Sequence, residues 1–289
     1  MSKKKNTVIS ICSKGHADVW KLTSNLLPIM VAADDYIVYV PESEIAFFEE
    51  ITDSSIRVES QESLGKEFYD KLKSKLESAE NGKRFGWYLQ QFYKIEAIQR
   101  ADSQLVTIWD ADCVPVSAIE VMNKDNKVVY VNSSREFHIP YFENIERLLG
   151  MTRIQTTCFV IPSFPMKRNW IKEFIDFVEQ THGMKWYDAI IKTTDFSQMS
   201  GFSETETLGT WVANKYPDEW ISRTGTWERY GQSRFGYARN IKPNKIIKLG
   251  KENNLEIITF ENWDTRGIKK IIKAIRRSIS KFRSAGAKS

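Results

Sequence analysis

Two aspartates separated by one residue follow an apolar run, LVTIWDADCVP at positions 105–115. In an extended chain, side chains two positions apart point the same way, so the carboxylates of Asp110 and Asp112 can face one ion. Hard cations prefer oxygen ligands and keep coordination positions for water and substrate phosphates. The pattern therefore predicts a Mn²⁺ or Mg²⁺ site at Asp110 and Asp112. The alternative is a turn whose aspartates only cap backbone N–H groups.

Glu204 is the candidate for proton chemistry. The run Ser203-Glu-Thr-Glu206 fits a capping box, in which Ser203 and Glu206 satisfy backbone N–H groups at a helix start. Glu206 then has a structural duty, whereas Glu204 has none. General base catalysis needs a carboxylate that can take a proton from a substrate hydroxyl. We predict Glu204 as that base or as the residue that orients the substrate hydroxyl. The alternative is a favourable acid in a first helical turn.

The segment 86–100 predicts a strong helix with two stripes of side chains. One stripe is apolar and predicts contact with the core: Tyr88, Phe92 and Ile95. The neighbouring stripe contains Trp87, Gln91 and Lys94 at the same spacing. Gln91 and Lys94 could contact phosphates or sugar hydroxyls of a donor, with Trp87 as a stacking wall. A solvated polar face is the alternative for this second stripe.

His16 lies just after the first predicted strand, 7–12. A nucleotide base can rest at this position in a parallel α/β sheet, because ligands bind at the carboxyl ends of its strands. His16 is therefore a candidate donor-binding residue, and a loop role without ligand contact is equally open.

Strand and helix signals alternate through the first half of the chain. The predicted strands are 7–12, 36–40, 56–58 and 105–109, and the predicted helices are 18–31, 42–51, 68–79 and 86–100. The second half is less regular, with strands predicted at 127–131, 157–161 and 256–260, helices at 169–181, 203–215 and 266–282, and a loop-rich stretch at 220–240. Repeated strand–helix units predict an α/β fold with a mostly parallel sheet flanked by helices.

Two longer elements carry a resemblance. GWYLQQFYKIEAI, residues 86–98, followed by the Asp-Ala-Asp strand end, resembles a family of bacterial glycosyltransferase-like proteins with the GT-A fold. GFSETETLGTW, residues 201–211, is similar to a Ser-Glu-Tyr-x-x-Tyr-Gly element of that family, from which this chain departs at Thr205 and at 207–208. The resemblance covers about residues 7–215. It implies a GT-A-like single domain, assigned here to residues 1–264, that takes a nucleotide-sugar donor and a glycan or lipid-linked hydroxyl acceptor.

Two other functions remain open. A nucleotidyltransferase uses similar carboxylates. It would also need a Gly-rich basic loop, of which Ser13-Lys14-Gly15 is a short, incomplete version. A non-catalytic carbohydrate-binding protein could keep the same fold. The phosphate-loop pattern GxxxxGK[ST], the GxGxxG fingerprint, the GxSxG elbow and HExxH do not occur in the sequence.

Charge is unevenly placed along the 289 residues. The net charge is +5, yet residues 265–289 hold nine basic side chains and no acidic one, which leaves 33 basic against 37 acidic residues elsewhere. A mildly acidic body argues against nucleic acid as a partner. Isoleucines at helical spacing in 265–283 predict a basic amphipathic helix that binds an anionic membrane surface, or one that packs on the protein's own core. With three cysteines and no recognisable signal or membrane-spanning segment, we expect a cytoplasmic protein, peripheral at the membrane's inner face.

Overall fold

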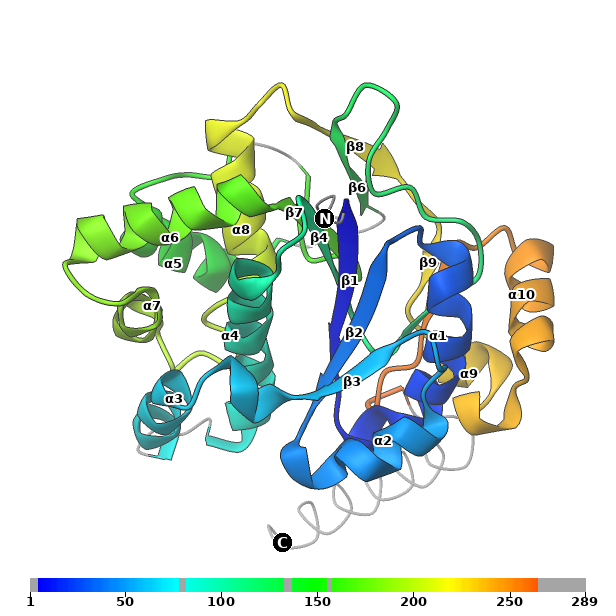
Figure 1. The fold of residues 1–289 in the computed structure, drawn as a ribbon. Coiled ribbons are helices and arrows are strands. Elements are labelled where there is room, and N and C mark those ends of the chain that lie inside the picture. Colours follow the sequence, from blue (N-terminus) through cyan, green and yellow to red (C-terminus); the bar gives the residue numbers. More distant parts are fainter. Residues whose placement is uncertain (1–4, 78–81, 133–136, 155–156, 265–289) are drawn as a thin grey trace, which may run out of the picture.

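The computed structural model describes residues 5–77, 82–132, 137–154 and 157–264. A five-stranded sheet runs through the centre of the molecule (Figure 1). In spatial order its strands are β3 (Arg57–Ser60), β2 (Asp35–Val40), β1 (Asn6–Ile11), β4 (Leu105–Trp109) and β7 (Ser163–Lys167). The first four are parallel, and β7 runs antiparallel to β4. The predicted α/β architecture with a central, mostly parallel sheet flanked by helices is confirmed.

The two middle strands are buried along their whole length. Every residue of β1 and of β4 is buried. Continuous apolar runs such as TVISI and LVTIW are typical of parallel strands that helices cover on both faces. These two strands therefore form the rigid base from which the loops at their carboxyl ends project.

Helices flank this sheet on both sides, as Figure 1 shows for α4 and for α1. Their bounds are α1 (Ala17–Met30), α2 (Ile45–Ile51), α3 (Glu67–Glu77), α4 (Phe85–Arg100), α5 (Ile139–Leu149), α6 (Arg168–His182), α7 (Trp186–Thr193), α8 (Glu204–Lys215), α9 (Gly231–Phe235) and α10 (Pro243–Glu252). The apolar stripe predicted on α4 is confirmed, because Tyr88, Phe92 and Ile95 are fully buried. Burial of that stripe fixes the orientation of α4 about its own axis, so the polar stripe faces the carboxyl end of β4.

Two smaller sheets complete the fold. One joins β5 (Cys113–Pro115), β10 (Ile257–Thr259) and β9 (Trp227–Glu228), and the other joins β6 (Val128–Asn132) to β8 (Trp220–Thr224). β5 follows the Asp-Ala-Asp turn directly, and β10 pairs antiparallel with it, with Thr259 opposite Cys113. This pairing carries the residues after β10 to the same turn, although about 150 positions separate them in the sequence.

The second half of the chain differs from its predicted elements. The strand predicted at 157–161 is wrong, because this segment is irregular and the strand forms at β7 instead. Cys158, Phe159 and Ile161 are nevertheless buried. A short apolar run predicts burial but does not by itself predict backbone geometry. The helices α5, α7 and α10 were not predicted, and the stretch predicted as loop-rich, 220–240, contains β8, β9 and α9.

Residues 265–289 lie outside the described residues, so the predicted basic helix and the domain boundary at Asp264 stay predictions. Within the described part of the chain, no helix combines the length and the hydropathy needed to cross a bilayer.

Candidate functional site

A cavity of about 410 Å³ opens at the carboxyl ends of β1 and β4, and we call it the switch-point pocket. The chain runs from β1 outward through β2 to β3, and then adds β4 on the opposite side of β1. The boundary between β1 and β4 is therefore the point at which the strand order reverses, where open α/β sheets bind ligands. The pocket is thus positioned by topology as well as by side chains.

Every site residue predicted from the sequence lines this one pocket. They are Asp110, Asp112, Trp87, Gln91, Lys94, His16 and Glu204. They come from four separate elements: the ends of β1 and β4, the polar stripe of α4, and the first turn of α8. The structure brings them together, while their individual roles stay predictions.

Lys94 joins two of the predicted carboxylates. Its ammonium donates to Asp110 Oδ1 at 2.7 Å and to Glu204 Oε1 at 2.8 Å. The side chains of Lys94 and Glu204 are each 8% exposed, whereas that of Asp110 is 37% exposed. Burial opposes the charge on Lys94, but Asp110 and Glu204 outweigh it and raise the pKa of the ammonium. Lys94 is therefore a fixed positive charge at the floor of the pocket.

Gln91 links α4 to the start of α8. Its Oε1 accepts a hydrogen bond from the Glu204 N–H at 3.0 Å, and its Nε2 donates to the Trp87 carbonyl at 3.3 Å. Gln91 is 2% exposed. These bonds give the predicted donor-binding amide a clear local duty, because they hold the Glu204 backbone against α4. The carboxylate of Glu204 is thereby placed for Lys94.

The Asp-Ala-Asp turn is anchored by its backbone. The Asp110 N–H donates to the Pro162 carbonyl, and the Cys113 N–H closes the turn on the Asp110 carbonyl, both at 3.0 Å. Burial and, secondly, the charge of Asp110 raise the pKa of Asp112 from 3.8 to about 6. The two carboxylates are therefore close enough to repel each other, as two ligands of one cation would be.

Glu261 is a third acid at this place, and it was not among the residues predicted from the sequence. The Phe260 N–H donates to the Asp112 carbonyl at 3.0 Å, which fixes the end of β10 beside the turn. Burial, and then the charge of Asp112, raise the pKa of Glu261 from 4.5 to about 7. Its position directly after a predicted strand was the available signal. Only the pairing of β10 with β5 reveals which strand end it meets.

The oxygen donors suit a hard cation that takes part of its coordination from a substrate. Among the residues that the structure describes, no group of three or more His, Cys, Asp or Glu side chains could by itself hold a metal ion. Mg²⁺ in phosphate-handling sites is often bound by one or two carboxylates together with substrate phosphates. Asp110 and Asp112 fit a site of this kind, in which substrate phosphates would complete the coordination of the cation. The predicted metal dependence remains a hypothesis.

The His16 end of the pocket is aromatic and cationic. Burial lowers the pKa of the His16 imidazole, and its Nε2 lies 3.0 Å from Asn262 Nδ2. Trp227, Trp263 and Arg229 also line the pocket; Trp263 follows Asn262 in the chain, and Arg229 lies 5.0 Å from the centre of the Trp227 ring. Arg229 Nη2 lies 3.7 Å from Glu261, which makes Arg229 the cation next to the carboxylates on this side.

Half of the predicted capping box forms at the start of α8. The Glu206 N–H donates to Ser203 Oγ at 3.3 Å, whereas the Glu206 carboxylate has a structural partner other than the predicted one. This carboxylate accepts from the Phe159 N–H at 2.8 Å and lies 3.5 Å from Arg153 Nε. Glu206 is 1% exposed. It therefore ties the irregular segment after residue 157 to α8.

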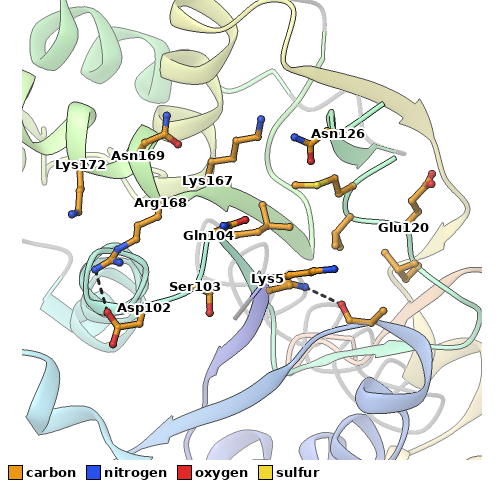
Figure 2. Close-up of a pocket in the computed structure, with 16 residues that line it drawn as sticks. Lys5, Asp102, Ser103, Gln104, Glu120, Asn126, Lys167, Arg168, Asn169 and Lys172 are labelled. Atoms are coloured by element: carbon orange, nitrogen blue, oxygen red, sulfur yellow. Dashed lines mark hydrogen bonds and ion pairs between the residues drawn. The ribbon is translucent and has the colours of Figure 1, made fainter. Parts of the chain in front are cut away.

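A second cavity, of about 920 Å³, lies at the opposite end of the central strands from the switch-point pocket, where β1 and β4 begin and β7 ends (Figure 2). Its basic residues include Lys5, Lys167, Arg168 and Lys172. Arg168 pairs with Asp102 at 3.2 Å and Lys167 pairs with Glu219 at 2.8 Å, while Lys5 and Lys172 are exposed. Because these charges are paired or solvated, the cavity is a weaker candidate for chemistry than the switch-point pocket.

Fold and site together define an α/β protein with a carboxylate-rich pocket at the switch point of its sheet. Residues 30–214 match the "Family of unknown function (DUF6492)", and the chain belongs to this family. The matched range contains α4, the Asp-Ala-Asp turn and nearly all of α8. No curated protein matches the sequence significantly.

Two solved structures are similar over most of the chain. The apo form of mouse xyloside xylosyltransferase 1 aligns with a TM-score of 0.46 at 10% sequence identity, covering 90% of this chain and 99% of that one. The galactosyltransferase LgtC, in complex with donor and acceptor sugar analogues, aligns with a TM-score of 0.46 at 8% identity, covering 88% and 86%.

Proposed function

We propose that this protein is a glycosyltransferase that moves a sugar from a nucleotide-diphosphate sugar to a hydroxyl of a glycan or lipid-linked acceptor. One observation carries the proposal: acids at the end of β4 share the switch-point pocket with a buried Lys94–Glu204 pair. A nucleotide site at the switch point, oxygen ligands for the cation of a diphosphate, and a carboxylate for an acceptor hydroxyl are the parts that such a reaction needs.

The donor would lie across the end of β4. We assign the nucleoside to the β1 side, near His16, and the diphosphate to Asp110 and Asp112. Mn²⁺ or Mg²⁺ bound there would stabilise the charge that develops on the leaving diphosphate. The raised pKa values of Asp112 and Glu261 support a cation at this place, because both carboxyl groups are buried and, secondly, lie beside other negative charges that a cation would offset. Arg229 would add a donor suited to phosphate oxygens.

Glu204 is the proposed acceptor-side carboxylate. Its Oε1 is engaged by Lys94, which leaves Oε2 as the oxygen that would take or orient the acceptor proton. Lys94 would keep Asp110 and Glu204 in fixed positions while the substrates bind, as a buried ammonium between two carboxylates must. Trp87, half-buried in the pocket wall, would provide an apolar surface for a sugar ring.

A product assay tests the proposal against its rivals. The protein would be incubated with Mn²⁺ and a panel of nucleotide sugars, with and without mixed glycan acceptors, and separately with nucleoside triphosphates and sugar phosphates. A glycosyltransferase releases a nucleoside diphosphate from one nucleotide sugar. Release of pyrophosphate from a triphosphate would instead identify a nucleotidyltransferase. Binding of a sugar without any turnover would identify a carbohydrate-binding protein.

We propose that the basic segment 265–283 holds the enzyme at an anionic membrane surface, where a lipid-linked acceptor would be presented. The support is its sequence pattern, since each basic residue near such a surface adds on the order of 1 kcal/mol of attraction.

A further inference from the structure

The switch-point pocket extends past Asp110 to the amino-terminal end of α4. Arg84, the last residue of a short 3₁₀ helix (Gly82–Arg84), stacks its guanidinium 4.0 Å from the centre of the Trp87 ring. Its Nη1 donates to Ser200 Oγ at 3.0 Å. Gln90 and Tyr141 also line the pocket, and Tyr141 packs on His138, whose Nε2 lies 2.9 Å from the Ser200 carbonyl. We call this part of the pocket the Arg84 lobe.

In the part of the chain that the structure describes, no ion pair neutralises the charge of Arg84. Its guanidinium contacts the Ser200 hydroxyl and the Trp87 ring there, and no described carboxylate lies at ion-pair distance. The other cations of the pocket differ, since Lys94 contacts Asp110 and Glu204, and Arg229 lies near Glu261. A guanidinium carries five N–H donors in a planar fork, which matches a phosphate or a carboxylate. Stacking on Trp87 orders that fork before a ligand arrives.

The position of the lobe indicates which substrate it meets. Contacts sort the lining residues into two groups, because His16 lies against Asn262, after β10, whereas Arg84 bonds to Ser200, just before α8. The Asp-Ala-Asp turn contacts both groups, the first through the Phe260 N–H on the Asp112 carbonyl and the second through Lys94 on Asp110. If the nucleoside lies at the β1–β4 boundary and the diphosphate at Asp110 and Asp112, the Arg84 lobe, at the amino-terminal end of α4, is left for the acceptor. Glu204, the proposed acceptor-side carboxylate, is on the same side, because α4 and α8 are joined through Gln91.

We infer that the Arg84 lobe binds an anionic group, a phosphate or a carboxylate, carried by the acceptor sugar. This inference rests on the proposed glycosyl transfer and names the class of its acceptor. Trp87 and Tyr141 form an apolar wall for the sugar ring, while Arg84, Gln90 and Ser200 supply the polar contacts. A neutral sugar would leave the Arg84 fork without its partner, so the lobe discriminates by charge.

Binding measurements on the full-length protein test the inference. Glucose, glucose 1-phosphate and glucuronate serve as probes, in Mn²⁺ and a saturating amount of the tightest binder among UDP, GDP, ADP and CDP. The wild type should bind one of the two anionic sugars at least about tenfold more tightly than glucose, as expected for hydrogen bonds to a charged group. Arg84→Gln should remove this preference, and Arg84→Lys should keep only part of it. Lys83→Gln, which changes an exposed neighbour outside the pocket, should bind like the wild type.

Nucleotide binding in the absence of sugar identifies the source of the anion. Arg84→Gln should leave the affinity for the nucleoside diphosphate within about twofold of the wild type. A loss as large as that for the anionic sugar would show that Arg84 contacts the donor diphosphate, and would overturn the inference. Equal binding of charged and neutral sugars by the wild type, or no binding of either anionic sugar, also overturns it. Failure of every nucleotide to bind would refute the proposed function, whereas an Arg84-dependent preference for anionic sugar could still be measured in Mn²⁺ without a nucleotide.

Discussion

Replacing Asp112 with Asn should reduce the stability that the protein loses as the pH rises from 5 to 8. Asp112 is an acid whose pKa is raised in the folded protein, to about 6 from 3.8. The unfolded chain therefore releases this proton at lower pH than the folded protein does, and the folded state loses stability as pH rises from about 4 through 6. At about 1.4 kcal/mol per pKa unit, the whole loss is about 3 kcal/mol. Roughly 1.4 kcal/mol of it falls between pH 5 and pH 8.

The measurement is urea unfolding followed by tryptophan fluorescence, with EDTA present, at pH 5 and pH 8. Asp112→Asn should lose about 1–1.5 kcal/mol less unfolding free energy over this interval than the wild type. Removing the charge of Asp112 also relieves Glu261, whose raised pKa depends on it, so the second effect has the same sign. Asp125→Asn, at an exposed position before β6, is the control and should behave like the wild type. Identical pH dependence in all three proteins would refute the electrostatic reading of the Asp-Ala-Asp turn.

Three further outcomes are expected. Asp110→Asn and Asp112→Asn should each abolish the stabilisation that Mn²⁺ plus a nucleoside diphosphate gives in thermal-shift assays; wild-type shifts in both would reject the metal site. Glu204→Gln should lower kcat by about 10²–10⁴ if it acts on the acceptor proton. Glu206→Gln should instead lower the free energy of unfolding by about 1–3 kcal/mol while folded molecules keep their turnover; the reverse pattern would exchange the two roles. A chain ending at Asp264 should stay folded and stop co-sedimenting with anionic liposomes; undiminished binding, or unfolding, would contradict the membrane hypothesis.

Local sequence was sufficient for the elements that surround the site. β1, β2, β4, α1, α4 and α8 were predicted close to their observed bounds, because each has a strong apolar pattern and clear end signals. The polar stripe of α4 was predicted from spacing alone, since burying Tyr88, Phe92 and Ile95 leaves Gln91 and Lys94 on an adjacent face. A strand end bearing Asp110 and Asp112 likewise needs no tertiary information.

The sequence pattern was weaker where backbone geometry depends on distant partners. The segment 157–161 has the composition of a strand, yet the Phe159 N–H is satisfied by the buried Glu206 carboxylate instead of a neighbouring strand. Side-chain hydrogen bonds of this kind replace a sheet ladder without leaving a pattern in the sequence.

Tertiary structure alone decided which charges meet. Lys94 and Glu204 are 110 positions apart, and only the packing of α4 against α8 buries them as a pair. Glu261 reaches Asp112 because β10 pairs with β5. Among the residues that the structure describes, the fold gives Arg84 a hydroxyl, Ser200, and the Trp87 ring as neighbours, and no carboxylate. Hydrophobic periodicity indicates which face of a helix or strand is buried, because that pattern lies within the element's own sequence. Which charged side chains form pairs depends on the distances between different elements, and only the folded chain fixes those distances.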